Sequence, residues 1–358
     1  MELKLLPKMP FQCMVACMHA TTEERINALC RRQCAFALYC LSGEAEPVFC
    51  MAEDGRVEDD PIFKNGFILA AFDGKSLFIP SELTDIPTAD TWPEMQRIPD
   101  HGATTRGAYT SLFQLYTGFI RTGQVRKIVL ARTADEEITP EFSPYRAFRA
   151  ACVANPTAFK ALVHTPAYGT WLFCTPEQLI TGRGDCWNTM ALAGTRIPST
   201  LPWDSKNRQE QALVTEFIRE TLGPLAKELY EGPLENLRAG SIEHLCTRFI
   251  FQMPPGRMLM LLDKLPPTPA VCGSPVNEAR ALLQRYPDID RSCYAGYLGP
   301  WGNGAVHLYV SLRCMQIFDD VCRLYAGGGL MPDSVEEQEW QETENKMACM
   351  RQAIRNAY

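Results

Sequence analysis

A glutamate on the apolar face of a predicted helix is the first candidate for chemistry. Helical periodicity is predicted over residues 204–222. Within that span Glu210 comes three residues before Leu213 and four before Val214, so it lies on the apolar face of the helix. A carboxylate in a protein core is costly unless it is paired or bound to a cation. Glu210 is therefore expected either to bind a metal ion or to form a buried salt bridge.

A second predicted helix, over residues 334–354, carries further carboxylates. Glu339 and Glu342 are three residues apart, so their side chains can converge on one ligand. Lys346 follows Glu342 by four residues and can reach the same place. Inward carboxylates from two helices suggest a magnesium-type site made of oxygen ligands. The alternative is a solvated acidic face with an ordinary Glu–Lys pair.

A lysine and a glutamate at strand ends could act as base and acid. Lys127 opens an apolar stretch in a strand predicted over 126–133. A desolvated lysine has a lowered pKa and can act as a general base, whereas a lysine at a strand end is more commonly exposed. Glu177 follows Pro176 at the end of another predicted strand. If the two strands are neighbours, these side chains form an acid/base pair.

Two glycine segments end predicted strands and could bind an anionic ligand. They are residues 193–196 (Ala-Gly-Thr-Arg) and 326–329 (Ala-Gly-Gly-Gly). Glycines let a carboxylate or phosphate approach the backbone N–H groups. Arg313 ends another strand and offers two parallel donors to a carboxylate. Neither glycine segment is a nucleotide-binding fingerprint.

The elements that must position these residues predict an α+β fold. Residues 159–164 and 170–174 form a predicted hairpin, and successive strands are predicted over 294–298, 305–313 and 321–326. Strands without a regular strand–helix alternation favour antiparallel sheets. A segment at 84–103, rich in Pro, Asp and Thr, is predicted to connect an N-terminal region to the rest.

Composition limits the class of protein. The chain has 358 residues, 46% of them hydrophobic, and a formal charge of −7. These values are typical of a globular protein of one large domain or two, and they argue against a nucleic-acid surface. The sequence shows no apolar stretch of about 20 residues and no signal peptide at its start, so a cytoplasmic protein is expected.

Fifteen scattered cysteines also favour a reducing compartment. Cys13, Cys17, Cys30 and Cys34 form two C-x3-C pairs, which leaves a zinc site open as an alternative. The spacing departs from the usual C-x2-C of zinc sites. Because residues 23–42 are predicted to be helical, the last two cysteines are expected to pack on one helix face.

The motifs together resemble the chorismate-utilising enzymes, and most closely the isochorismate synthases of menaquinone and siderophore pathways. The resemblance runs from about Gly107 to the C-terminus, and the preceding hundred residues match weakly. The motifs that carry it, in chain order, are KIVLAR (127–132), TPEQL (175–179), ALAGTR (191–196), EHLCTR (243–248), PTPAVCG (267–273), YAGYLG (294–299), LYAGGGL (324–330) and EWQETENK (339–346).

The resemblance implies one chorismate-binding domain over residues 1–358, with 1–100 as its divergent part and 107–358 as its catalytic region. In such a fold two large antiparallel β-sheets pack on each other, with helices outside. The implied reaction is the reversible, Mg2+-dependent isomerisation of chorismate to isochorismate, in which water enters at C2 and the C4 hydroxyl leaves. Lys127 would activate the water, and Glu177 would protonate the leaving hydroxyl.

The remaining roles follow from the same motifs. Glu210 and Glu342 would hold Mg2+, and Glu339 would be a further ligand of the same ion, often through a water molecule. His244 would lie near the C4 hydroxyl and Tyr294 near the pyruvyl group. The residues implied in binding the substrate carboxylates are Gly194, Thr195, Arg313, Gly327 and Lys346.

Two positions discriminate within the family. Relatives that use ammonia carry glutamine in place of Lys127, and aminodeoxychorismate synthases carry a lysine in place of Ala193. Salicylate synthases share both features with isochorismate synthases, so the sequence leaves that product open. Pro266 and Gln211 stand where the family usually has histidine. These departures keep a second alternative open, a chorismate-binding protein with little catalysis.

The expected context is a monomer without a glutaminase partner. The absence of fused domains favours menaquinone over siderophore biosynthesis as the pathway.

Overall fold

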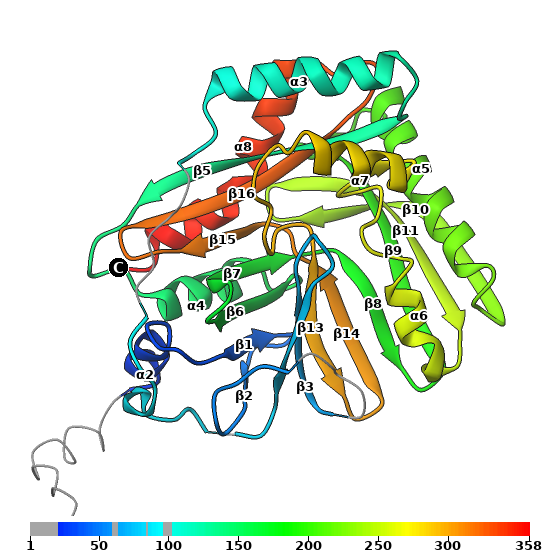
Figure 1. Ribbon diagram of the computed structural model, residues 1–358. Helices are drawn as coiled ribbons and strands as arrows, with labels where there is room; N and C mark the ends of the chain where they lie inside the picture. Colours follow the sequence, from blue (N-terminus) through cyan, green and yellow to red (C-terminus); the bar gives the residue numbers. More distant parts are fainter. Residues whose placement is uncertain (1–20, 59–63, 84, 96–101) are drawn as a thin grey trace, which may run out of the picture.

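The computed structural model describes residues 21–58, 64–83, 85–95 and 102–358. These residues form two eight-stranded sheets, and every strand pair in both of them is antiparallel (Figure 1). The fold class expected from the sequence is therefore confirmed.

The first sheet contains the strand that begins with Lys127. Its order is β12 (Gly273–Ser274), β5 (Lys127–Glu137), β16 (Val321–Leu330), β15 (Cys314–Ile317), β7 (Gly169–Thr175), β6 (Phe159–Thr165), β1 (Phe36–Cys40) and β2 (Val48–Met51). β5 and β16 pair over ten positions, so Gly329 lies opposite Val129 and Gly327 opposite Ala131. The predicted hairpin is formed by β6 and β7.

The second sheet contains the strand that ends with the predicted glycine segment 193–196. Its order is β10 (Glu228–Ala239), β11 (Ile242–Gln252), β9 (Cys186–Arg196), β8 (Gln178–Arg183), β14 (Ala305–Val310), β13 (Tyr297–Gly302), β3 (Gly66–Ala70) and β4 (Ser76–Pro80). The register of β9 and β11 shifts between His244 and Leu245, and this shift places Gly194 in a β-bulge.

Alternation along the strands builds the core between the sheets. On β6, Phe159, Ala161 and Val163 join the main hydrophobic cluster, whereas Leu162 belongs to a second cluster with side chains of α4 and α8. Phe159 stacks on Tyr309 of the other sheet, with ring centroids 4.2 Å apart. This period of two is the expected pattern for a strand buried on both faces.

Helices cover the sheets and carry part of the site. They are α2 (Thr22–Leu29), α3 (Arg106–Arg121), α4 (Pro144–Ala154), α5 (Ser205–Leu222), α6 (Met258–Leu262), α7 (Val276–Arg285) and α8 (Glu336–Arg355). In Figure 1, α3 and α8 lie along β5 and β16, and the contacts of these elements agree. α5 packs against β9 and β11 of the second sheet.

Two local predictions were wrong. The helix predicted over 23–42 ends at Leu29, and residues 36–40 form β1 because their large side chains pack on both faces of the sheet between β2 and β6. Cys30 and Cys34 are both buried, whereas Cys13 and Cys17 lie outside the described residues. The connection predicted over 84–103 also lies partly outside them.

The second error is the start of the helix that was predicted over residues 334–354. The helix begins at Glu336 after Val335, and the Ser334 hydroxyl accepts a hydrogen bond from the Met331 amide at 2.9 Å. That hydroxyl therefore satisfies the preceding turn and does not cap the helix.

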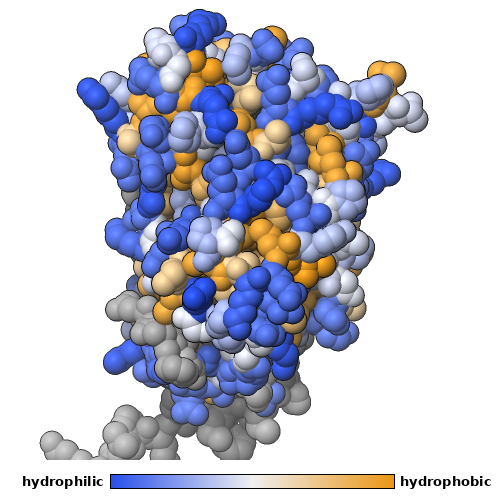
Figure 2. All heavy atoms as spheres, turned by 90° about the vertical axis from the view of Figure 1, so that its right-hand side faces the viewer, coloured by the Kyte–Doolittle hydropathy of each residue, from blue (hydrophilic) through white to orange (hydrophobic). Residues whose placement is uncertain are grey.

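The surface around α5, α6 and β10 is predominantly hydrophilic. Figure 2 views the molecule from this side and shows hydrophobic residues gathered in several separate groups among polar ones. Within the described part of the chain, no helix is long and apolar enough to cross a membrane.

Candidate active site

A small cavity of about 60 Å³ collects most of the residues expected to act. Nine of the twelve predicted site residues line it, and they come from distant parts of the sequence. They are Glu177, Gly194, Thr195, Glu210, His244, Tyr294, Arg313, Gly327 and Lys346. Of the other three, Lys127 and Glu342 form ion pairs with members of this group, whereas Glu339 pairs with Lys206, which does not line the cavity.

Lys127 and Glu210 form a buried ion pair beside the cavity. The Lys127 Nζ lies 2.9 Å from Glu210 Oε1, and the two side chains are 0% and 10% exposed. The lysine belongs to the first sheet, and the glutamate belongs to the helix that packs on the second. Burial raises the pKa of Glu210, but the nearby ammonium groups, Lys127 first, outweigh burial and lower it. Lys127 is thus buried and not exposed, and Glu210 forms the buried salt bridge that was one of its two expected roles; its role as a metal ligand stays a prediction.

Glu177 is a buried carboxyl group that favours its protonated form. Only 2% of the residue is exposed. Desolvation raises its pKa to about 8, and the opposing attraction of Lys127, Lys346 and Arg313 is too weak to cancel this effect. At neutral pH this side chain can therefore donate a proton to a group in the cavity.

The two predicted metal-binding carboxylates of α8 are each paired with a lysine. Glu342 Oε1 lies 2.7 Å from the Nζ of Lys346, which also donates to the Gly327 carbonyl at 2.9 Å. Glu339 is only 1% exposed and pairs with Lys206 of α5. Burial, followed by the repulsion of Glu342, raises the pKa of Glu339. The two carboxylates do lie close together, as the spacing predicted.

His244 and Arg313 form a fixed pair in the cavity wall. Arg313 donates from Nη2 to the His244 Nε2 at 2.6 Å, so Nε2 is the unprotonated nitrogen. The other nitrogen, Nδ1, then carries the proton and donates to the Gly194 carbonyl at 3.0 Å. Burial, with the positive charge of Arg313, holds the pKa of His244 well below its usual value. His244 is therefore neutral and orients the guanidinium group.

Backbone conformation helps to aim these groups. Arg313 has a φ of 47°, which is rare for a residue other than glycine, and Gly194 has a φ of 68° in its bulge. The Thr195 amide that follows donates to Asn207 Oδ1 of α5 at 3.0 Å. The bulge thus fixes both the histidine's acceptor and a neighbouring hydroxyl at the cavity.

The three glycines of β16 make room for functional side chains. A Cβ atom on Gly327 would lie 2.8 Å from the Tyr294 hydroxyl oxygen, and one on Gly328 would lie 2.9 Å from Glu339 Oε2. A Cβ atom on Gly329 would lie 2.3 Å from Glu210 Oε1. Such contacts are shorter than normal packing allows. Gly327 also lines the cavity, and its direct contact with a ligand stays a prediction.

A buried ion pair holds β5 against the loop that lines the cavity. Asp288 Oδ2 accepts hydrogen bonds from Arg291 at 2.6 Å and from the Ala131 amide at 2.7 Å. The guanidinium group of Arg291 also donates to the carbonyls of Val129 and Val271, both at 2.8 Å. This arrangement fixes the strand two residues from Lys127.

Replacing Asp288 with alanine is expected to lower the free energy of unfolding by about 3–5 kcal/mol, because Arg291 would be left as an uncompensated buried charge. The side chains of the pair are 4% and 2% exposed. Glu235→Ala is the matched control. Glu235 pairs with Arg248, the two side chains are 43% and 51% exposed, and the pair should contribute less than about 1 kcal/mol. Urea unfolding monitored by circular dichroism measures both. Equal midpoints for the two variants would contradict the assigned role.

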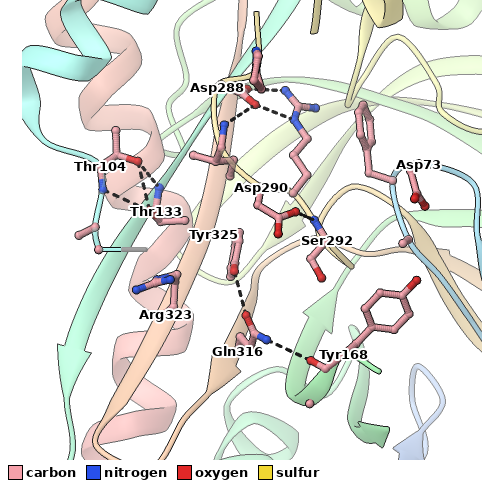
Figure 3. A pocket seen from close by; sticks show the side chains of 18 of the residues that line it. Asp73, Thr104, Thr133, Tyr168, Asp288, Asp290, Ser292, Gln316, Arg323 and Tyr325 are labelled. Atoms are coloured by element: carbon pink, nitrogen blue, oxygen red, sulfur yellow. Dashed lines mark hydrogen bonds and ion pairs between the residues drawn. The ribbon is translucent and has the colours of Figure 1, made fainter. Parts of the chain in front are cut away.

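A larger surface hollow of about 990 Å³ lies beside the cavity (Figure 3). Tyr325 lines both spaces. The charged groups of the hollow are held by other protein groups, as Arg323 is by Asp135 at 2.8 Å and Asp290 by the Ser292 amide at 3.0 Å. The predicted acid, carboxylates and substrate-binding residues do not line it, so we place the active site in the smaller cavity.

The donor set fits a hard divalent cation. Glu339 Oε2 is buried and has no hydrogen-bond partner in the part of the chain that the structure describes. Lys206 contacts Glu339, and the charges of Glu210 and Glu342 also act on it. Among residues 21–58, 64–83, 85–95 and 102–358, no three His, Cys, Asp or Glu side chains are already grouped as metal ligands. The carboxylates are turned toward lysines instead.

Sequence reasoning missed Lys206. It lies four residues before Glu210 on α5, a spacing that suggests a pair within the helix. Its nitrogen reaches Glu339, 133 positions away in the sequence. Burial lowers the pKa of Lys206, but attraction by Glu339, Glu210 and Glu342 outweighs this and raises it. Only the packing of α5 near α8 shows this contact.

The family profile described as "Chorismate binding enzyme" matches residues 85–355. The chain belongs to this family. The match includes all twelve predicted site residues.

Two curated relatives resemble this chorismate-binding enzyme over about two thirds of its length. Isochorismate synthase MenF of Escherichia coli is 32% identical over 254 residues, which are 68% of this chain and 59% of the relative. The salicylate biosynthesis isochorismate synthase of Pseudomonas aeruginosa is 31% identical over 250 residues, 66% of this chain and 52% of the relative. The chain thus spans little more than half the length of these relatives.

A solved structure confirms the fold over nearly the whole chain. The menaquinone-specific isochorismate synthase MenF from Escherichia coli superposes with a TM-score of 0.75 and 24% identity, covering 92% of this chain and 91% of that one. Within this chain, β1 to β4 lie in the same two sheets as the later strands.

Proposed function

We propose that this protein is an isochorismate synthase, which interconverts chorismate and isochorismate with Mg2+. The observation that carries the proposal is Glu177, a buried carboxyl group with a pKa of about 8, in the cavity beside the Lys127–Glu210 pair. The similarity to the two isochorismate synthases supports the choice of reaction.

The reaction needs one base and one acid. Lys127, once it has lost the proton that it holds in the ion pair with Glu210, accepts a proton from the water that attacks C2, and Glu177 donates a proton to the hydroxyl that leaves C4. The ring double bonds shift, and one water enters as another leaves. Glu177 lines the cavity, and Lys127 is paired with Glu210 of the same cavity wall, so the two groups lie at one site. To reach the water, Lys127 must move from its contact with Glu210.

Basic and backbone groups of the cavity bind the substrate carboxylates. Arg313, oriented by His244, and Lys346 supply positive charge, and Thr195 supplies a hydroxyl. We assign Gly194 and Gly327 to the same binding role. Tyr294 would lie against the pyruvyl group, and His244 near the C4 hydroxyl.

Mg2+ would be held by Glu210 and Glu342, with Glu339 in the same group. The unpartnered Glu339 Oε2 supports this assignment, as does the combined effect of the three carboxylates on the charge of Lys206. The cation, when bound, neutralises the ring carboxylate of the substrate. Because carboxylates are hard oxygen ligands, they favour magnesium over zinc.

The departures from the family do not alter the predicted acid, base or ligands. Pro266 lies outside the cavity wall and lines a separate surface pocket. Gln211 is buried, and its Nε2 donates to the Ala191 carbonyl at 3.1 Å, so it serves the packing of α5 on β9. We propose a cytoplasmic monomer that acts in menaquinone biosynthesis without a glutaminase partner.

Purified protein incubated with chorismate and Mg2+ is expected to form isochorismate up to a fixed equilibrium ratio, as measured by chromatography. Excess chelator should abolish the reaction, and added Mg2+ should restore it. Salicylate with pyruvate as products would keep the site and assign a salicylate synthase, which the relative from Pseudomonas aeruginosa keeps as the second candidate. Unchanged chorismate that nevertheless binds would show a chorismate-binding protein without this activity.

A further inference from the structure

Three lysines neutralise three glutamates beside the cavity. Lys127 pairs with Glu210, Lys346 with Glu342 and Lys206 with Glu339. The chemistry above uses the first two lysines. Lys206 has no part in it, although its charge acts on all three carboxylates.

Lys206 differs from Lys127 in its access to solvent. Its side chain is 19% exposed, whereas that of Lys127 is 0% exposed. Lys206 lies in the first turn of α5, where a long side chain can rotate outward without displacing the core. Of the two, only Lys206 can leave the carboxylates without opening the protein.

A divalent cation and Lys206 would compete for the same oxygens. The ammonium group contacts Glu339 Oε1, and the other oxygen, Oε2, is buried without a hydrogen-bond partner among the described residues. A metal ion between Glu339 and its two neighbours would lie within a few ångströms of the ammonium group. At such distances in a buried site, the repulsion between the two cations is strong.

We propose that Lys206 is an internal counter-ion of this carboxylate cluster, and that the divalent cation displaces it on binding. The inference rests on the proposed function, which supplies the cation. Lys206 keeps the metal-free site neutral and folded, and its displacement weakens the apparent affinity for the metal. It is a positioning residue that sets the metal concentration at which the enzyme becomes competent.

Calorimetric titration with MgCl2 alone tests the competition. Lys206→Met is expected to bind Mg2+ at least about tenfold more tightly than the natural protein, and its metal-free form should melt at a lower temperature. Lys75→Met is the matched control, because Lys75 pairs with Asp73 at 3.1 Å but is 79% exposed. Its affinity should be unchanged. Equal or weaker binding by Lys206→Met would overturn the inference, even if isochorismate is formed.

A second measurement needs no variant of the site. Reductive methylation with formaldehyde labels accessible amines, and mass spectrometry gives the rate for each lysine. Labelling of Lys206 relative to Lys75 should rise severalfold when Mg2+ saturates the protein. An unchanged or lower ratio under saturation would refute displacement. If calorimetry detects no Mg2+ binding by the natural protein, both the proposed metal site and this inference are refuted.

Discussion

Replacing Lys127 with alanine is expected to lower the rate of isochorismate formation by a factor of about 10²–10⁴, the usual contribution of a general base. The side chain is fully buried and begins the strand next to the glycines of β16. The neighbouring basic groups have other partners: His244 Nε2 accepts from Arg313, Lys346 is bound to Glu342 and Gly327, and Lys206 is bound to Glu339. Initial rates from chromatography of the products measure the effect.

Loss of a buried lysine can also damage the fold, so a matched control is needed. Lys160 is likewise 0% exposed, lies on β6 and donates to the Pro156 carbonyl at 3.4 Å, away from the cavity wall. Lys160→Ala should keep the natural rate per folded molecule, with folding checked by circular dichroism. If Lys127→Ala retains the rate of that control, the base has been assigned to the wrong residue.

The sequence correctly predicted the helix and the hairpin whose side-chain pattern is visible within one short segment. The helix over 204–222 and the hairpin of β6 and β7 formed where side-chain spacing placed them. The helix predicted through residue 42 failed, because Phe36–Cys40 are fixed by pairing with β6, more than a hundred residues away. Pairing over such separations leaves no mark in a short window of sequence.

The site shows the same division. The burial of Glu210 followed from its place among apolar residues, and the closeness of Glu339 and Glu342 followed from a spacing of three. The partner of Glu339 did not follow, because Lys206 reaches it from another helix. The burial of Lys127 could not be predicted from the sequence either, since a lysine at a strand end is exposed unless another element covers it.

The family resemblance, and not the local periodicity, indicated which distant residues belong to one site. Nine of the residues it implied line one cavity, although they are spread over 170 positions from Glu177 to Lys346. Their roles remain predictions, and the acid is the one whose physical state can be checked in two independent ways.

Glu177→Gln is expected to remove activity and, at the same time, to stabilise the protein at alkaline pH. Glutamine keeps the shape of the carboxyl group but cannot donate the proton, so the rate should fall by a factor of about 10²–10⁴. For the natural enzyme, kcat/KM should decline above a pH of about 8, where Glu177 loses its proton. A variant with the natural rate and the same alkaline decline would remove Glu177 from the mechanism.

The effect on stability has a definite sign. The ordinary pKa of a glutamate is 4.5, and burial raises that of Glu177 to about 8, so between these values the folded protein binds the extra proton. The natural protein therefore loses stability as the pH rises through that interval, and Glu177→Gln does not share this loss. The free energy of unfolding of the variant minus that of the natural protein should therefore be a few kcal/mol larger at pH 9 than at pH 4. This estimate uses about 1.4 kcal/mol for each unit by which the pKa is raised.

Glu243→Gln provides the opposite case. The hydrogen bond from Arg196 lowers the pKa of Glu243, so this carboxylate stabilises the fold above its ordinary pKa and loses that effect as the pH falls. The control should therefore be less stable than the natural protein at neutral pH and should approach it in acid. Denaturant titrations at several pH values separate the two behaviours. If Glu177→Gln follows the same course as Glu243→Gln, the carboxyl group of Glu177 is ionised at neutral pH and cannot be the acid.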